Sequence, residues 1–478
     1  MIQVCYALWG HSAVLLTRWP HDRVATIDHL PEDALLEIFD AYRKDMELER
    51  CYEKLWNSND GWFKLTHVCR RWRRLVHLSP TRLHVHLLFT PCRSSRVLIL
   101  KNLPPFPVLV DYYTSFWTER VESLALAALR HRSRVRGIVL RTPWDMVKLL
   151  RALSRPFPEL ESLEICPSLS VNSELPILPA RFRLLSGSAP CLRRLTLREV
   201  APRYLSSLLS VSTALVELTL SLRIERVSSF PLEVLLLLNL RSMSCLRHLD
   251  LSLICYFDTT PPPPAGTGDV IPLSKLTHLI FRGHRLHFQA LVVGFFAPSL
   301  RHLDVRLSGS YHGLFPIPHL GKLIRDTECH FTAVRLVFSR RKLEFYTRTG
   351  FQSVDEPLFR IIIHEDISLK QMGRELSEQL STIEDLIIEP PFGENHPPTQ
   401  WRRLFYRLPR VKNVQVSFSD AFNVAQSFQQ DGQELGLDLL PTLETVMVDM
   451  RDPLASIRGA FNPLITARQQ AGRPITLL

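Results

Sequence analysis

Hydrophobic and polar positions follow a repeated six-residue pattern along most of the chain. The pattern is L-x-x-L-x-L, and its copies begin at Leu160, Leu192, Leu215, Leu246, Leu276 and Leu300, with weaker copies at Ala333, Leu358, Ile383, Val411 and Leu443. Successive copies are 23 residues (Leu192 to Leu215) to 33 residues (Leu300 to Ala333) apart. This period predicts one β-strand and one helical or irregular return segment per unit. Because each unit can bury its leucines only against neighbours, we expect the strands to form a curved parallel array.

Further segments extend this array at both ends and between its strands. Upstream, VESLAL at Val121 and VRGIVL at Val135 are predicted strands, and SPTRLHVHLLF (79–89) also favours a strand. Return segments at 202–212 and 231–244 have helical spacing. Two stretches rich in proline and glycine, 258–271 and 389–400, are predicted to be exposed loops.

A different, helical pattern lies near the N-terminus, in the segment DHLPEDALLEIFDAY (28–42). Pro31 suits a first helical position, and the acidic residues after it favour the positive end of the helix dipole. Leu35, Ile38, Phe39 and Tyr42 share one side at helical spacing. A helix of about three turns is marginal alone, so this side must pack on something.

A second amphipathic helix is predicted after a polar stretch. Its apolar side consists of Leu65, Val68, Cys69, Trp72 and Val76, its opposite side carries Arg70, Arg71, Arg73 and Arg74, and Pro80 ends it. Two short helices with one apolar side each cannot bury both sides fully against each other. We therefore expect Phe39 and Trp72 to stay incompletely covered by their own chain and available to a partner.

The segments LPEDALLEIF and LTHVCRRWRRLV resemble the F-box, the helical module that docks on the adaptor of Skp–Cullin–F-box ubiquitin ligases. The resemblance covers residues 28–80, with an insertion near 44–61 similar to those of F-box proteins from mushroom-forming fungi. It implies that the adaptor contacts are Leu30, Pro31, Leu35, Ile38, Phe39, Val68, Cys69 and Trp72. Residues 81–478 resemble the degenerate leucine-rich repeats that follow many F-boxes. The expected fold is therefore α/β, with a short helical F-box followed by a leucine-rich-repeat-like solenoid.

Two other interpretations of the helical pair stay open. The pair could be a helical hairpin that caps a larger core. The arginine-rich helix is also typical of nuclear-import, membrane-surface and calmodulin-binding segments.

The composition limits which cellular compartment and which class of partner we expect for the protein. The chain of 478 residues has a net charge of +11, which favours acidic partners. Its nine cysteines include no CxxC pair, which argues against a zinc site and a disulfide framework and for a reducing compartment. Residues 1–27 lack the charged start of a signal peptide and are interpreted as a poorly ordered leader. Without an apolar run of about 18 residues, we expect no membrane span and a cytoplasmic or nuclear location.

The main alternative to a repeat protein is a leucine-rich α/β enzyme. GxSxG, HExxH, GxGxxG and a complete P-loop are all absent from the sequence. We therefore predict no catalytic residues, no cofactor and no enzymatic activity.

Candidate binding residues come from the alternation within each six-residue pattern. The fourth and sixth places point inward, so the third, fifth and seventh places should line the open face of the sheet. His248, His278 and His302 occupy the third place and should form a column beside Asp250 and Asp304. A flat row of imidazoles does not converge on a tetrahedral centre, so no metal site is expected. The predicted target-binding residues are Arg194, Arg198, Glu217, His248, Asp250, His278, Arg282, His302, Asp304 and Arg306. A solvated face without a ligand is the alternative.

The sequence thus predicts the substrate receptor of a ubiquitin ligase. Its partners would be a Skp-type adaptor, through it a cullin, and an unidentified protein target. A non-degradative scaffold or regulator is the alternative. A nucleic-acid-binding solenoid is suggested by the positive charge, but aromatic stacking platforms are scarce on the predicted strands.

Overall fold

The computed structural model divides the chain into two compact units. The first comprises Met1–His86 and Ile99–Pro107, and the second comprises Leu87–Leu98 and Val108–Leu478. The structure describes residues 27–48, 61–79, 85–89, 107–113, 119–142, 147–167, 184–187, 189–200, 209, 213–224, 239–255, 270–308, 318–327, 333–337, 342–346, 359–363, 373–374, 376–389, 397–429, 438–449 and 455–478. Among these residues no helix has both the length and the apolar character needed to cross a bilayer.

The described residues of the N-terminal unit form a short 3₁₀ turn and three α-helices. The turn η2 spans Ile27–His29, followed by α2 (Glu32–Leu48), α3 (Gly61–Thr66) and α4 (Arg70–Leu78). Helix α2 begins directly after Pro31, with Glu32 and Asp33 in its first turn, as the sequence predicts. It continues past Tyr42 into the inserted segment, whose residues 49–60 lie outside the described part of the chain.

The second predicted helix is in fact two helices, and this corrects the sequence-based prediction. Cys69 adopts an extended backbone and its sulfur accepts a hydrogen bond from the Trp72 amide, so it caps the start of α4. The chain turns at His67–Val68 between α3 and α4, and the Arg73 side chain donates to the Thr66 carbonyl at 2.8 Å. Because of this break, Val68 leaves the apolar side and is 57% exposed.

The core of the N-terminal unit contains side chains from all three helices. Leu35 and Phe39 of α2, Leu65 of α3 and Trp72 of α4 are all buried. The rings of Phe39 and Trp72 lie 4.8 Å apart. The expectation that these two side chains stay uncovered for a partner is wrong, because a third helix supplies the packing surface that two helices lack. Phe39 and Trp72 are 1% and 8% exposed.

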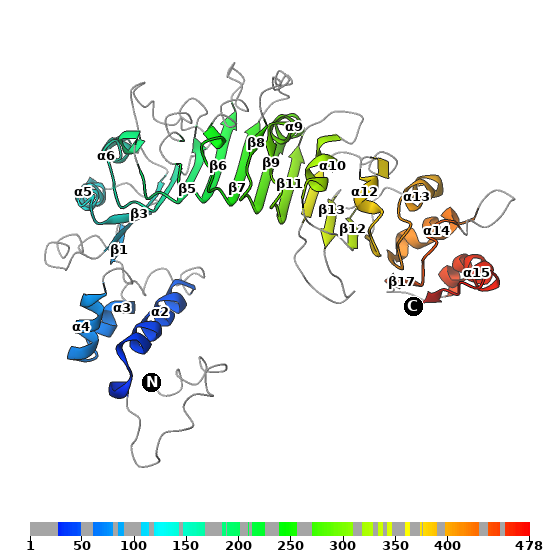
Figure 1. The fold of residues 1–478 in the computed structure, drawn as a ribbon, viewed down its shortest axis with the longest axis horizontal. Coiled ribbons are helices and arrows are strands. Elements are labelled where there is room, and N and C mark those ends of the chain that lie inside the picture. Colours follow the sequence, from blue (N-terminus) through cyan, green and yellow to red (C-terminus); the bar gives the residue numbers. More distant parts are fainter. Residues whose placement is uncertain are drawn as a thin grey trace, which may run out of the picture. The chain divides into compact units, whose positions relative to one another are not determined.

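The second unit is built on one sheet of 16 described strands (Figure 1). Its order is β1-β2-β3-β4-β5-β6-β7-β9-β11-β14-β13-β12-β15-β16-β17-β18. The first nine of these strands are β1 (Val85–Phe89), β2 (Val108–Tyr113), β3 (Val135–Thr142), β4 (Ser162–Pro167), β5 (Arg194–Val200), β6 (Glu217–Ile224), β7 (His248–Cys255), β9 (His278–His284) and β11 (His302–Ser308). The others are β12 (Ala333–Val337), β13 (Lys342–Tyr346), β14 (Phe359–Ile363), β15 (Asp385–Glu389), β16 (Asn413–Ser417), β17 (Thr445–Asp449) and β18 (Thr476–Leu477).

All eleven copies of the six-residue pattern from Leu160 onward form strands, which confirms this part of the prediction. The strands expected at Val135 and within 79–89 are also present, as β3 and β1. From β2 to β11 each strand pairs in parallel with its neighbour in the sheet. The inward leucines of the fourth and sixth places, such as Leu249 and Leu251, are fully buried.

The segment VESLAL is a helix and not the predicted strand. It lies in α5 (Glu119–Leu129), whose buried residues Val121, Glu122, Ala125, Ala128 and Leu129 follow helical spacing. Glu119 and Glu122 lie in the first turn, where negative charge stabilises a helix, and the alanines have high helix propensity.

An antiparallel insertion interrupts the predicted parallel order of the strands, which is a further correction. Strand β13, which the sequence analysis did not predict, lies between β12 and β14 and is antiparallel to both. Consequently β14 pairs with β11, whereas β12 pairs with β15, although β12 comes first in the chain.

Helices connect many of the strands and contact one another in succession. They are α5, α6 (Val147–Ala152), α9 (Arg285–Val293), α10 (Pro318–Arg325), α12 (Ser377–Leu380), α13 (Pro398–Phe405), α14 (Phe418–Ser427) and α15 (Ala455–Gln470). Helix α5 contacts α6, α10 contacts α9 and α12, and α14 contacts α13 and α15. A separate pair of short strands, β8 (Ile271–Pro272) and β10 (Phe295–Phe296), lies beside α9.

Several predicted connections fall mostly outside the described residues. This applies to the return segments 202–212 and 231–244 and to most of both predicted loops. The described ends of the loops are ordered elements, since Ile271 belongs to β8 and Pro398 begins α13.

Candidate functional site

The third places of the pattern form one continuous row on the open face of the sheet. Strand pairing puts Ser162, Arg194, Glu217, His248, His278 and His302 directly beside one another across β4 to β11. All six side chains are half-buried or exposed. The row begins after Gly137 of β3, where a side chain would clash, because a Cβ there would lie 2.5 Å from Leu109 Cδ2.

The predicted histidine column is confirmed. The rings of His248 and His278 stack with centroids 5.2 Å apart, and those of His278 and His302 are 5.5 Å apart. The Thr277 hydroxyl lies 2.9 Å from Nδ1 of His278. Desolvation lowers the pKa of His278 below its ordinary value, and the positive charge that His248 and His302 can carry lowers it further.

The lowered pKa of His278 predicts that acid weakens the fold. Between this pKa and the value of about 6.5 in the unfolded chain, the unfolded state binds more protons, so stability falls as pH drops below about 6.5. We expect His278→Gln to reduce this loss, with a small effect because the side chain is exposed. The measurement is the melting temperature of both proteins at about pH 7.5 and about pH 5.5. An equal acid-induced decrease in both would contradict the prediction.

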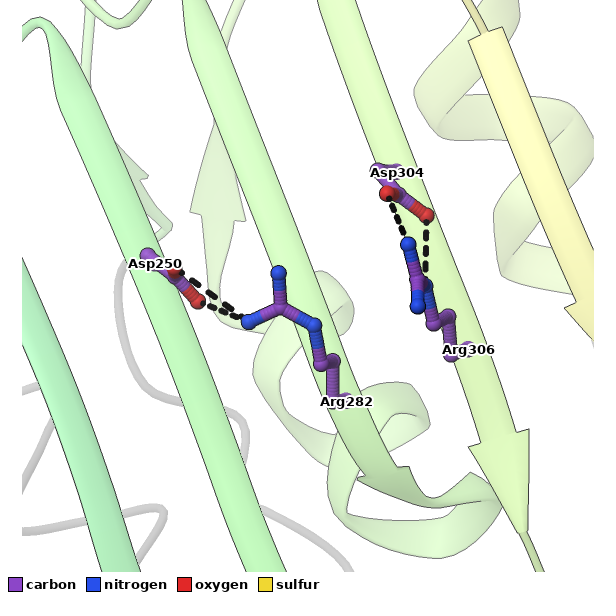
Figure 2. A network of polar contacts seen from close by, with 4 residues as sticks. All are labelled: Asp250, Arg282, Asp304 and Arg306. Carbon is purple, nitrogen blue, oxygen red and sulfur yellow. Dashed lines mark hydrogen bonds and ion pairs between the residues drawn. The ribbon is translucent and has the colours of Figure 1, made fainter. Parts of the chain in front are cut away.

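Arginines at the seventh place pair with carboxylates at the fifth place. Figure 2 shows Arg282 of β9 reaching across to Asp250 of β7, with Nη1 2.9 Å from Oδ1. It also shows Arg306 folded back on Asp304 of the same strand, with Nη2 3.1 Å from Oδ2. Arg141 of β3 binds Glu164 of β4 through two hydrogen bonds of 2.9 and 3.1 Å. These arginines are therefore already neutralised, which leaves less positive charge for a target than the sequence suggests.

The remaining open-face residues lie as follows. Arg198 is exposed at the end of β5, where a register irregularity precedes Val200. Arg360, interpreted from the sequence as a third-place residue, pairs in register with Asp304 and so falls in the fifth-place row. Arg335 lies on β12, opposite Glu344 of β13, and is separated from the histidine column by the inserted strands.

A row of second-place residues was missed by the sequence analysis. Each directly precedes its strand. The amide of each later residue donates to the carbonyl of the one before it, and these hydrogen bonds of 2.8 to 2.9 Å link, in order, Arg193, Val216, Arg247, Thr277 and Arg301. Arg193, Arg247 and Arg301 are exposed. In the described part of the chain none of these three arginines forms an ion pair with a carboxylate. The sequence does contain this information, because arginine is the second letter in the copies that begin at Leu192, Leu246 and Leu300.

Metal chemistry gains no support from the described residues. They contain no cluster of three or more His, Cys, Asp or Glu side chains arranged to hold a metal ion. Cys69, Cys166, Cys191 and Cys245 form no disulfide bond among the described residues.

The predicted adaptor-binding residues divide into three groups by exposure. Leu35, Phe39 and Trp72 are buried in the core of the N-terminal unit and so are not exposed to a partner. Leu30, Ile38 and Cys69 are half-buried, whereas Pro31 and Val68 are exposed. Leu78 at the end of α4 is also exposed, at 65%, although the resemblance does not include it.

Comparisons with known proteins do not assign the chain to a family. No protein-family model matches the sequence, and no curated protein is significantly similar to it.

Proposed function

We propose that the protein is the substrate receptor of a Skp–Cullin–F-box type ubiquitin ligase, active in the cytoplasm or nucleus. The N-terminal unit would be the F-box and would dock on the adaptor, and the sheet unit would be a leucine-rich-repeat-like solenoid that binds a protein target. The chain itself would carry out no chemistry. It would act by proximity, because holding a target near an activated ubiquitin raises the effective concentration of the two reactants.

The exposed Val68 is the observation that best supports adaptor docking. An apolar side chain on a turn between helices gains free energy when a partner covers it. Val68 belongs to the Val-Cys-Arg-Arg-Trp sequence on which the F-box resemblance depends, and it remains 57% exposed in the helical unit. Pro31 of the leucine–proline opening is exposed as well. Phe39 and Trp72, which also belong to the F-box resemblance but are buried, would pack beneath this surface and hold its residues in position.

Val68→Glu is expected to weaken binding of the Skp-type adaptor by about 30-fold or more, as for an interface hot spot. The reason is that a carboxylate would be desolvated in an apolar contact. Co-precipitation of the full chain with the adaptor, followed by titration, measures this loss.

Leu78→Glu is the matched control, because Leu78 is an equally exposed apolar residue of the same unit. This variant should bind the adaptor as the wild type does, and circular dichroism should show both variants folded. Wild-type affinity of a folded Val68→Glu variant would refute the docking proposal. If the adaptor binds but no bound target is ubiquitinated, the protein is a non-degradative scaffold.

A further inference from the structure

The second-place row carries arginines whose positive charge is not neutralised by the described residues. The seventh-place arginines Arg141, Arg282 and Arg306 are engaged with Glu164, Asp250 and Asp304, whereas Arg198 of β5 is exposed. Arg193, Arg247 and Arg301 have no such partner in the described part of the chain, and all three are exposed. Arg194, the next residue on β5, is exposed too. Guanidinium groups that are available to an anionic ligand therefore lie along this row.

The spacing of the row is regular. Arg193, Arg247 and Arg301 directly precede β5, β7 and β11, and one strand lies between each successive pair, β6 in the first case and β9 in the second. Neighbouring strands are about 4.8 Å apart, so two intervals amount to about 10 Å. The intervening residues, Val216 and Thr277, are short and half-buried. The three exposed arginines thus recur at equal intervals along the row, with smaller side chains between them.

This spacing matches an extended peptide that crosses the strands. In the extended polyproline II conformation a chain advances about 3.1 Å per residue and completes one turn in three residues, so every third side chain returns to the same side after about 9 Å. Aspartate, glutamate or phosphorylated side chains at positions i, i+3 and i+6 would each face one arginine. Arginine pairs well with carboxylate and phosphate because its planar group can donate two parallel hydrogen bonds.

We propose that the row of Arg193, Arg247 and Arg301 binds an extended acidic segment of the protein target, with one acidic residue in every three. This inference deepens the proposed function and rests on its target-binding role for the sheet unit. The neighbouring histidine column borders the same row, since His248 and His302 directly follow Arg247 and Arg301.

A protein segment fits this row better than a nucleic acid. Proteins that bind single strands pair a basic groove with aromatic side chains on which the bases stack. On β4 to β11 the second, third, fifth and seventh places include no Phe, Tyr or Trp. The row also carries only one arginine for every second strand, so it does not form a continuous basic groove.

The test uses the full chain and two fluorescent peptides of identical composition. One has glutamate at every third residue with serine and proline between, and the other has the glutamates consecutive. We expect the spaced peptide to bind more tightly. Arg247→Glu should weaken its binding by about tenfold or more, because it places like charges together at the centre of the row. Arg301→Glu should also weaken binding of the spaced peptide.

Arg155→Glu is the matched control, since Arg155 is an exposed arginine between α6 and β4 and its substitution changes the net charge equally. It should leave binding of the spaced peptide unchanged. Equal affinity for both peptides, or equal losses in Arg155→Glu and Arg247→Glu, would overturn the inference in favour of nonspecific attraction. Tighter binding of a single-stranded RNA of equal charge, lost in Arg247→Glu, would overturn it in favour of a nucleic acid.

The outcome separates this inference from the proposed function. Adaptor binding is measured with Val68→Glu and does not depend on the second-place row. A protein that binds the adaptor but not the spaced peptide would refute the acidic-segment inference alone. A protein that binds the spaced peptide but not the adaptor would refute the ligase proposal and leave the row as a binding site.

Discussion

Phe39→Ala is expected to lower the free energy of unfolding of the N-terminal unit by about 3 to 5 kcal/mol. The phenyl ring is almost fully buried and packs on Trp72 at 4.8 Å, so its removal leaves a cavity among three short helices. Such helices have little stability of their own and depend on this packing. Hydrogen exchange of peptides from α2, α3 and α4 measures the change in the full chain.

Ala41→Gln is the control for Phe39→Ala, because Ala41 is exposed on the same helix and glutamine is a good helix former. Its exchange should match the wild type. Unchanged exchange in Phe39→Ala would show that the helical core is not organised around this ring. Phe39→Ala and Val68→Glu should both reduce adaptor binding, but only the first should do so by unfolding the helices.

Leu251→Ala is expected to destabilise the sheet unit by about 2 to 5 kcal/mol. Leu251 is fully buried at the sixth place of β7, in register with Leu220 of β6 and Phe281 of β9. In a repeat array each strand depends mainly on its neighbours, so faster hydrogen exchange should be strongest in β6, β7 and β9. Urea denaturation of the full chain gives the total loss.

The adjacent Ser252 provides the comparison, since it lies on the opposite face of the same strand. Ser252→Ala should change stability by no more than about 0.5 kcal/mol. Equal stability of the two variants would contradict the assignment of an inward and an open face to β7.

The strands of the sheet were predictable because six-residue alternation recurs at a regular interval. The same pattern failed at Val121, where it is also compatible with a helix. Over so short a stretch Val121 and Ala125 fit a helical period as well as Val121 and Leu124 fit the repeat, and the alanines around them favour the helix. Strand β13 was missed because its segment, KLEFY, carries no repeat signal and its pairing is antiparallel.

The arrangement of side chains on the open face of the sheet was predictable in part. Alternation together with a constant register was sufficient to predict the histidine column. The ion pairs of Arg282 and Arg306 depend on side-chain orientation, which a linear pattern does not specify. The second-place row was overlooked because these residues precede the strands and so fall outside the alternation.

The helical unit shows how far periodicity alone can mislead. Helical spacing runs from Leu65 to Val76 without interruption in the sequence, yet the backbone breaks at Cys69. Whether Phe39 is covered depends on α3, which the sequence analysis had merged with α4.

The antiparallel insertion has a consequence for the order of assembly during synthesis. As the chain leaves the ribosome, strands can join the growing sheet one after another as far as β11. The next strand in space is β14, so β12 and β13 can pair with each other but cannot join the sheet until residues 359–363 have also emerged. The 55 residues from 309 to 363 must therefore appear before the sheet can grow beyond β11, and strands β15 to β18 can join only after this insertion has paired.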